Sequence, residues 1–159
     1  MLVLCLSFLI ALIDQVSKHL VRSYFMLGQQ HTVIPGFFDL RLIQNTGAAW
    51  GILSGLNHWL ILFSFVMLAV IVLFRRHFFT TDLTSRIALG LIVGGITGNL
   101  LDRVRLSYVV DFLDFYVGRR HFPAFNVADA AICVGVGFYV IFHVIYEPDE
   151  PEPEGASAD

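Results

Sequence analysis

The chain of 159 residues is 57% hydrophobic and 14% charged, with a mean hydropathy of +0.73. Soluble domains carry about 25% charged and about 45–50% apolar residues, so this composition excludes an ordinary soluble protein. The net charge of −3 combines two unlike regions: residues 147–159 hold four Glu and two Asp (−6), and residues 1–146 hold ten basic residues against seven Asp (+3).

Four apolar segments predict four transmembrane helices, near residues 2–22, 57–74, 85–104 and 126–146. Crossing about 30 Å of hydrocarbon requires roughly 20 mostly apolar residues. No Asp, Glu, Lys or Arg occurs between Leu42 and Phe74, whereas the first segment is long enough only if Asp14 and Lys18 lie within it. We therefore expect an all-α membrane protein with four transmembrane helices.

The connections predict a small additional structure and a separate tail. Residues 35–43 (PGFFDLRLI) alternate apolar and polar side chains, which is typical of a strand or hairpin, so we expect a β-like platform between the first and second helices. We expect one four-helix domain over residues 1–146 and a disordered acidic tail over residues 147–159, because that tail is rich in Pro and Glu and has no aromatic residue.

The orientation in the membrane is ambiguous from charge alone. The short connection between the second and third helices carries three basic residues, Arg75, Arg76 and Arg86. The other side carries seven, namely Lys18, Arg22, Arg41, Arg103, Arg105, Arg119 and Arg120. Counted without further information, the positive-inside rule places the long connections in the cytoplasm.

Asp14 and Lys18 are the first candidate site residues along the chain. They are four residues apart within an apolar segment, where ionisable groups are costly unless they are paired or hydrated. This spacing is compatible with an intrahelical ion pair, with Lys18 reaching toward the membrane surface, or with a contribution to a site.

Two motifs combine small and polar residues. In QNTGAAWG, residues 44–51, Asn45 and Gly47 predict a tight turn next to the aromatic Trp50. In GGITGNLLDRV, residues 94–104, two glycines four residues apart predict close helix packing. The same motif places Asn99, Asp102 and Arg103 on one helix face, where the last two residues could form a local ion pair.

The remaining candidates lie near the last predicted helix. Asp111 and Asp114 belong to an apolar β-like run (VVDFLDFY), which places them on opposite faces, so one can face a site while the other faces water or a basic partner. Asn126 is a typical N-cap, with Asp129 at the third helical position.

Two classes of function remain open at this point. Two adjacent carboxyl groups share a proton and can activate water, which is the chemistry of an aspartic hydrolase. Alternatively, Asp14, Asp102, Asp111 and Asp129 could relay protons or cations through a small transporter. The sequence has no HExxH or GxSxG motif and no basic face for nucleic acid, and we interpret Cys5 and Cys133 as core residues.

The motifs in chain order resemble those of bacterial lipoprotein signal peptidase, also called signal peptidase II or prolipoprotein signal peptidase. They are DQxxK (residues 14–18), NTGAAWG (45–51), GNLLDR (98–103), VVDF (109–112) and FNVADA (125–130). This resemblance implies a membrane-embedded aspartic endopeptidase that removes the signal peptide of prolipoproteins by cutting before the diacylglyceryl-modified cysteine.

The resemblance also implies roles for individual residues. It assigns the catalytic pair to Asp111 and Asp129, with no metal and no cofactor, and it leaves Asp114 outside the catalytic position. It assigns supporting or substrate-binding positions to Asp14, Lys18, Asn45, Gly47, Asn99, Arg103 and Asn126.

Family topology further implies a multi-pass protein of the bacterial inner membrane, with both termini in the cytoplasm and the site near the periplasmic face. This is opposite to the simple charge count. The implied partners are the lipid-modified prolipoprotein, membrane lipid and the inhibitor globomycin, with no nucleic acid, and we expect a monomer. We also expect an aromatic loop containing Phe37, Phe38 and Trp50 to form a platform or lid over the site.

Overall fold

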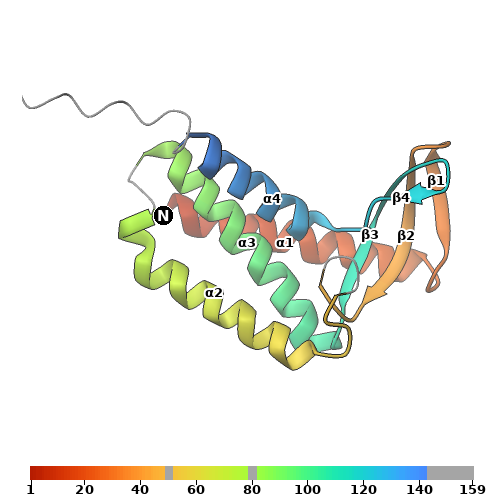
Figure 1. Ribbon diagram of the computed structural model, residues 1–159, viewed down its shortest axis with the longest axis horizontal. Helices are drawn as coiled ribbons and strands as arrows, with labels where there is room; N and C mark the ends of the chain where they lie inside the picture. Colours follow the sequence, from red (N-terminus) through yellow and green to blue (C-terminus); the bar gives the residue numbers. More distant parts are fainter. Residues whose placement is uncertain (49–51, 79–81, 143–159) are drawn as a thin grey trace, which may run out of the picture.

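The computed structural model describes residues 1–48, 52–78 and 82–142 and shows a helical bundle with a small sheet at one end (Figure 1). Its elements are α1 (Leu2–Tyr24), β1 (Gln30–Ile34), β2 (Phe38–Asn45), α2 (Asn57–Phe78), α3 (Leu83–Leu106), β3 (Val109–Val117), β4 (Arg120–His121) and α4 (Val127–Val140). The tail predicted at residues 147–159 and the predicted end of the last helix lie outside the described residues.

Helix α3 is the centre of the bundle because its glycines let both neighbouring helices approach closely. A Cβ atom on Gly94 would lie 2.8 Å from the backbone oxygen of Ser7 in α1, and one on Gly95 would overlap the carbonyl oxygen of Ala128 in α4. The hydroxyl of Ser7 also donates to the carbonyl of Gly90 at 3.1 Å. A Cβ atom on Gly98 would lie 2.6 Å from Asp14 Oδ2 of α1, so the close packing predicted for Gly94 and Gly98 is confirmed, and Gly95 adds a contact with α4 that was not predicted.

Three of the helices are long and apolar enough to cross a membrane, namely α1, residues 57–75 of α2, and α3. The described part of α4 is also apolar but has only 14 residues. The outer faces of the helices expose large apolar side chains, including Phe8, Phe63 and Leu73. Cys5 and Cys133 are exposed as well, so their interpretation as core residues was wrong: in a bundle of this kind, apolar residues face outward as well as inward.

The sheet has four antiparallel strands in the order β1-β2-β3-β4. Strands β1 and β2 form the hairpin predicted from the alternating pattern, and Gly36 in the turn between them has a φ of 80°. The expectation that the platform comes from the first connection alone was incomplete, because β3 and β4 lie between α3 and α4 and supply half of the strands. Val21, Leu42, Val110 and Phe112 form a buried apolar cluster that joins the sheet to α1.

The two ends of the bundle differ in structure. The sheet lies beyond the carboxyl end of α1, whereas Met1 and the last described turns of α4 lie at the opposite end of the bundle (Figure 1). The side-chain amide of Asn57 donates to the carbonyl of Arg103 at 3.2 Å, which ties the start of α2 to the end of α3 near the sheet. The carboxyl end of α3, the strands β3 and β4 that follow it, and the start of α4 therefore all lie at the sheet end of the bundle.

Replacing Gly95 with Ala should lower the thermal midpoint of the protein in detergent. The added methyl group would overlap a backbone carbonyl of α4, which cannot move away as a flexible side chain can, and overpacking of this kind costs about 1–3 kcal/mol. Gly137→Ala in α4 is the matched control, because a Cβ atom there has no neighbour within 4 Å. Equal thermal midpoints for the two variants would contradict the packing described here.

Candidate active site

All nine residues predicted for the site belong to one hydrogen-bonded network at the sheet end of the bundle. Each residue in the following order contacts the next: Asp14, Lys18, Asn99, Asp129, Asn126, Asp111, Asn45, Gly47 and Arg103. These residues come from α1, β2, the loop after β2, α3, β3 and the N-terminal end of α4. The fold thus joins positions that are up to 115 residues apart along the chain.

Asp111 lies at the buried start of β3 and is 3% exposed. Asp114 is on the opposite face, where its carboxylate lies 2.8 Å from Nδ1 of His121. The prediction that only one of the two carboxylates faces the site is therefore confirmed, and the partner of the other one is a histidine. Strand geometry explains the difference, because residues three apart in a strand point to opposite faces.

Asp129 is held by the first turn of α4. The side-chain oxygen of Asn126 accepts the backbone N–H of Asp129 at 3.0 Å, and Asp129 Oδ2 accepts the backbone N–H of Asn126 at 3.2 Å. This reciprocal capping box confirms the predicted N-cap and fixes the position of the Asp129 carboxyl group. The positive end of the helix dipole favours a negative charge there.

Three asparagine side chains direct their amide N–H groups at the two carboxyl groups. Asn126 donates to Asp111 Oδ1 at 2.7 Å, Asn45 donates to Asp111 Oδ2 at 2.9 Å, and Asn99 donates to Asp129 Oδ1 at 2.7 Å. Each amide oxygen accepts a different hydrogen bond, from the backbone N–H of Asp129, the backbone N–H of Gly47 and the ammonium group of Lys18, respectively.

These second contacts determine which way each amide points. An asparagine offers two acceptor lone pairs on one side and two N–H donors on the other. Since the oxygen of each amide is already committed, the donors must face Asp111 and Asp129. Both carboxyl groups are thus surrounded by oriented donors.

Burial and the neighbouring charge favour the protonated form of Asp111. Desolvation is the larger cause and repulsion from Asp129 the smaller, and together they raise the pKa of Asp111 from 3.8 to about 7. The hydrogen bonds from Asn45 and Asn126 act in the opposite direction. Two carboxyl groups in this relation can hold one proton between them near neutral pH. Such a pair can both accept a proton from water and donate one to a carbonyl oxygen.

Arg103 and Gly47 close the side of the site formed by the loop after β2. Arg103 Nη2 lies 3.4 Å from the carbonyl oxygen of Gly47, and its charge attracts Asp129, Asp111 and Asp102. A Cβ atom on Gly47 would lie 2.6 Å from the carbonyl oxygen of Ile52, so only glycine allows this turn to close. The turn predicted from Asn45 and Gly47 is therefore present.

Two further residues of the network were not included in the predicted site. Asp102 contacts Lys18 at 3.2 Å, and Gln15 donates to Asp102 at 3.0 Å and to Asp14 at 3.3 Å. The suggested local ion pair of Asp102 with Arg103 was thus the wrong pairing. Gln15 could have been predicted from the sequence, because it is a polar residue within an apolar span and buried polar groups require partners.

An aromatic cluster covers the sheet next to the site. Phe115 packs against Phe37, Phe38 and Phe125, with ring centroids 5.4, 4.5 and 5.8 Å away. Phe37 and Phe38 thus form part of an aromatic platform. Trp50, which was expected to share it, lies outside the described residues.

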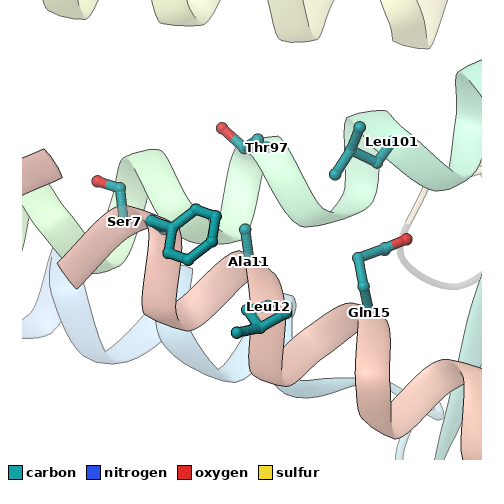
Figure 2. Close-up of a pocket in the computed structure, with 7 residues that line it drawn as sticks. Ser7, Ala11, Leu12, Gln15, Thr97 and Leu101 are labelled. Atoms are coloured by element: carbon teal, nitrogen blue, oxygen red, sulfur yellow. The ribbon is translucent and has the colours of Figure 1, made fainter. Parts of the chain in front are cut away.

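An apolar groove of about 290 Å³ lies between α1 and α3 and meets this network at Gln15. It is lined by Ser7, Phe8, Ala11, Leu12 and Gln15 of α1 and by Thr97 and Leu101 of α3 (Figure 2). Thr97 and Leu101 are each two positions from Asn99, which places them on the opposite side of α3 from the carboxyl pair. Gln15 separates this groove from the buried charges.

Comparisons with known proteins agree with one another. The family model described as "Signal peptidase (SPase) II" matches residues 6–145. A lipoprotein signal peptidase of Coxiella burnetii (strain Dugway 5J108-111) is 40% identical, with 93% of each chain covered. One from Syntrophus aciditrophicus (strain SB) is 44% identical, with 84% of this chain and 86% of the relative covered.

Solved structures show the same fold. A bacterial membrane enzyme determined by the in meso method at 2.3 Å resolution superposes with a TM-score of 0.86 at 31% sequence identity, covering 96% of this chain and 93% of the other. A second one, at 1.9 Å resolution, gives a TM-score of 0.80 at the same identity, with 92% and 94% covered. The chain therefore belongs to the signal peptidase II family, the proteases that remove the signal peptides of lipoproteins.

Proposed function

We propose that the protein is an aspartic endopeptidase that cuts prolipoproteins immediately before the diacylglyceryl-modified cysteine, with Asp111 and Asp129 activating the attacking water. The observation that carries this proposal is the convergence of three oriented asparagine amides on these two carboxyl groups. Asn126 contacts both aspartates, through its side chain and through its backbone N–H, so the two carboxyl groups lie close together.

The proton begins on Asp111 and the negative charge on Asp129. Asp111 is almost completely buried, whereas Asp129 is partly exposed and lies at the positive end of a helix. The ionised Asp129 takes a proton from water as the water oxygen attacks the scissile carbonyl carbon. Asp111 donates its proton to the carbonyl oxygen, which gives a tetrahedral diol.

The diol then collapses with the protons returning to their first positions. The C–N bond breaks as the departing nitrogen takes the proton from Asp129, and Asp111 recovers a proton from one diol hydroxyl. The products are a signal peptide with a new carboxyl group and a lipoprotein whose modified cysteine carries the new amine. Neither step requires a metal or a cofactor.

The two unlike ends of the bundle support a proposal for the arrangement in the membrane. We propose that α4 and the residues after it form a fourth span, that both termini are cytoplasmic, and that the sheet and the site lie at the periplasmic face of the inner membrane. Lys18 is neutralised by Asp14 and Asp102, and Arg103 by the site carboxylates, so these two residues do not act as free positive charges. With these two residues paired, the excess of free positive charge counted at the sheet end is smaller, which supports the proposed orientation.

The substrate enters this site sideways from the bilayer. Its signal-peptide helix would lie beside α3 and α4, with its acyl chains against their apolar outer surfaces and the aromatic platform above. We expect the enzyme to work as a monomer with membrane lipid around it, and globomycin to compete with the prolipoprotein.

Asp111→Asn and Asp129→Asn should each reduce processing of a lipid-modified prolipoprotein by at least about a thousand-fold, because each removes a proton acceptor or donor that the other carboxyl group cannot replace. Gel-shift assays of the purified variants in detergent measure this loss. The variants should remain folded and membrane-inserted.

Asp114→Asn is the matched control for this pair. Asp114 lies on the same strand and is also 3% exposed, but it faces His121 on the other side of the sheet. It should keep processing within a few-fold of the wild-type rate. Normal processing by either site variant, or complete loss in the control with an intact fold, would refute the assignment of the pair.

The rate of processing should fall as the pH rises through about 7, which is the value to which burial and Asp129 raise the pKa of Asp111. The reason is that the mechanism needs the Asp111 proton, which is present below this pH and lost above it. A pH profile of kcat between about pH 5 and about pH 9 tests this. A rate that continues to rise above pH 8 would contradict it.

The same proton contributes to stability with a definite sign. Because the folded-state pKa of Asp111 is raised, its contribution is fully present below pH 3.8 and is lost as the pH rises through about 7. Asp111→Asn has no proton to lose at this position. Its thermal midpoint should therefore fall less than that of the wild type over this range, and equal declines would count against the assignment.

Removal of residues 147–159 should leave processing unchanged. These residues have no counterpart in the family motifs, and the family model ends at residue 145. Assays of the truncated protein in proteoliposomes, beside the full chain, measure the effect. Loss of activity at an unchanged thermal midpoint would show that the tail has a role in the reaction.

A further inference from the structure

Lys18 is a buried cation whose three protons all have partners. Its side chain is 2% exposed, and Nζ lies 2.8 Å from Asp14 Oδ2, 3.2 Å from Asp102 Oδ2 and 2.9 Å from Asn99 Oδ1. An ammonium group has three N–H donors, so these contacts use its full capacity. An isolated ion pair with Asp14 would use only one of these three N–H donors.

Each partner of Lys18 also holds a group next to one of the two site carboxylates. Asp14 Oδ1 accepts the backbone N–H of Ala128 at 2.9 Å, directly before Asp129. Asp102 Oδ2 accepts the backbone N–H of Val110 at 3.0 Å, directly before Asp111.

The third partner reaches a site carboxylate itself. Asn99 donates to Asp129 Oδ1 at 2.7 Å, with its oxygen facing Lys18. The three contacts therefore link one ammonium group to the backbone before Asp111, to the backbone before Asp129 and to the Asp129 carboxylate.

Several charged groups besides its direct partners lie around Lys18. The charged groups facing this region are Asp14 from α1, Asp102 and Arg103 from α3, Asp111 from β3 and Asp129 from α4. Gln15 contributes a neutral amide that donates to Asp14 and Asp102, and its oxygen accepts from Nη1 of the charged Arg105 of α3 at 3.5 Å. The positive charge of Lys18 also acts on Asp111, where it favours the ionised form.

We propose that Lys18 is a positioning residue for the aspartate pair. Through Asp14, Asp102 and Asn99 it sets the separation of Asp111 and Asp129, and its charge stabilises the single negative charge that the pair must carry. This inference rests on the proposed function. It adds Asp102 to the residues on which the geometry of the pair depends.

A purely structural role for Lys18 makes a different prediction. In that case Lys18 would only neutralise buried carboxylates during folding, and removing one carboxylate together with the lysine would restore the enzyme. Breaking a buried ion pair by removing one partner is strongly destabilising because it leaves an unpaired buried charge. A double variant therefore separates the two roles.

The experiment compares Lys18→Met with the double variant Lys18→Met/Asp14→Asn in detergent, using a synthetic diacylglyceryl-modified prolipoprotein peptide. The single variant should lose both thermal stability and activity. The double variant should recover thermal stability, because the asparagine oxygen can still accept the N–H of Ala128. Its kcat should remain at least about ten-fold below wild type, with KM within about two-fold.

The pH profile supplies a readout that loss of stability would not move. Without the charge of Lys18, the pKa of Asp111 rises, so the fall in kcat at alkaline pH should move to higher pH by about half a unit or more. Gln15→Met is the matched control, because Gln15 contacts Asp14 and Asp102 but carries no charge. In that control the midpoint of the fall should stay at the wild-type pH.

Recovery of kcat together with stability in the double variant, or an unchanged pH midpoint, would overturn the positioning role. Failure of the proposed function has a different signature, since Asp111→Asn and Asp129→Asn would then keep processing. The two results are therefore distinguishable in the same assay.

Discussion

The structure depends on the pairing of charges within an apolar bundle. Lys18, Asp14 and Asp102 are almost completely buried, and unpaired charges in such surroundings cost several kcal/mol. One ammonium group contacts both carboxylates and an amide, and its contacts with Asp102 and Asn99 join α1 to α3. The carboxylates in turn hold the backbone at the starts of β3 and α4.

This constraint has a direct consequence for the aspartate pair. Asp111 is placed by a strand and Asp129 by a helix, and neither element alone controls the distance between them. Asn126 contacts both aspartates and is fully buried, so it cannot exchange their hydrogen bonds for water. A protein that activates water with two carboxyl groups needs such rigidity, because small displacements of reacting groups reduce the rate steeply.

The outer surface of the bundle is apolar, whereas the site is polar and charged. Residues such as Phe63 and Leu73 of α2 are exposed although they are strongly apolar, and α2 buries few of its side chains. In hydrocarbon this arrangement costs nothing, and helix contacts come instead from close packing of small residues. Gly94 and Gly95 of α3 provide these contacts on two sides, which leaves α2 peripheral while α1, α3 and α4 form the support of the site.

The sequence by itself predicted the apolar spans, a strand or hairpin at residues 35–43 and the N-cap at Asn126, because each depends on local spacing or composition. It also predicted that Asp111 and Asp114 face opposite sides, since strand periodicity is local. It did not predict the pairing of Asp102 with Lys18 or the addition of β3 to the hairpin. Those contacts join residues 64 to 84 positions apart, and only the tertiary packing of the helices and strands brings such residues within hydrogen-bonding distance.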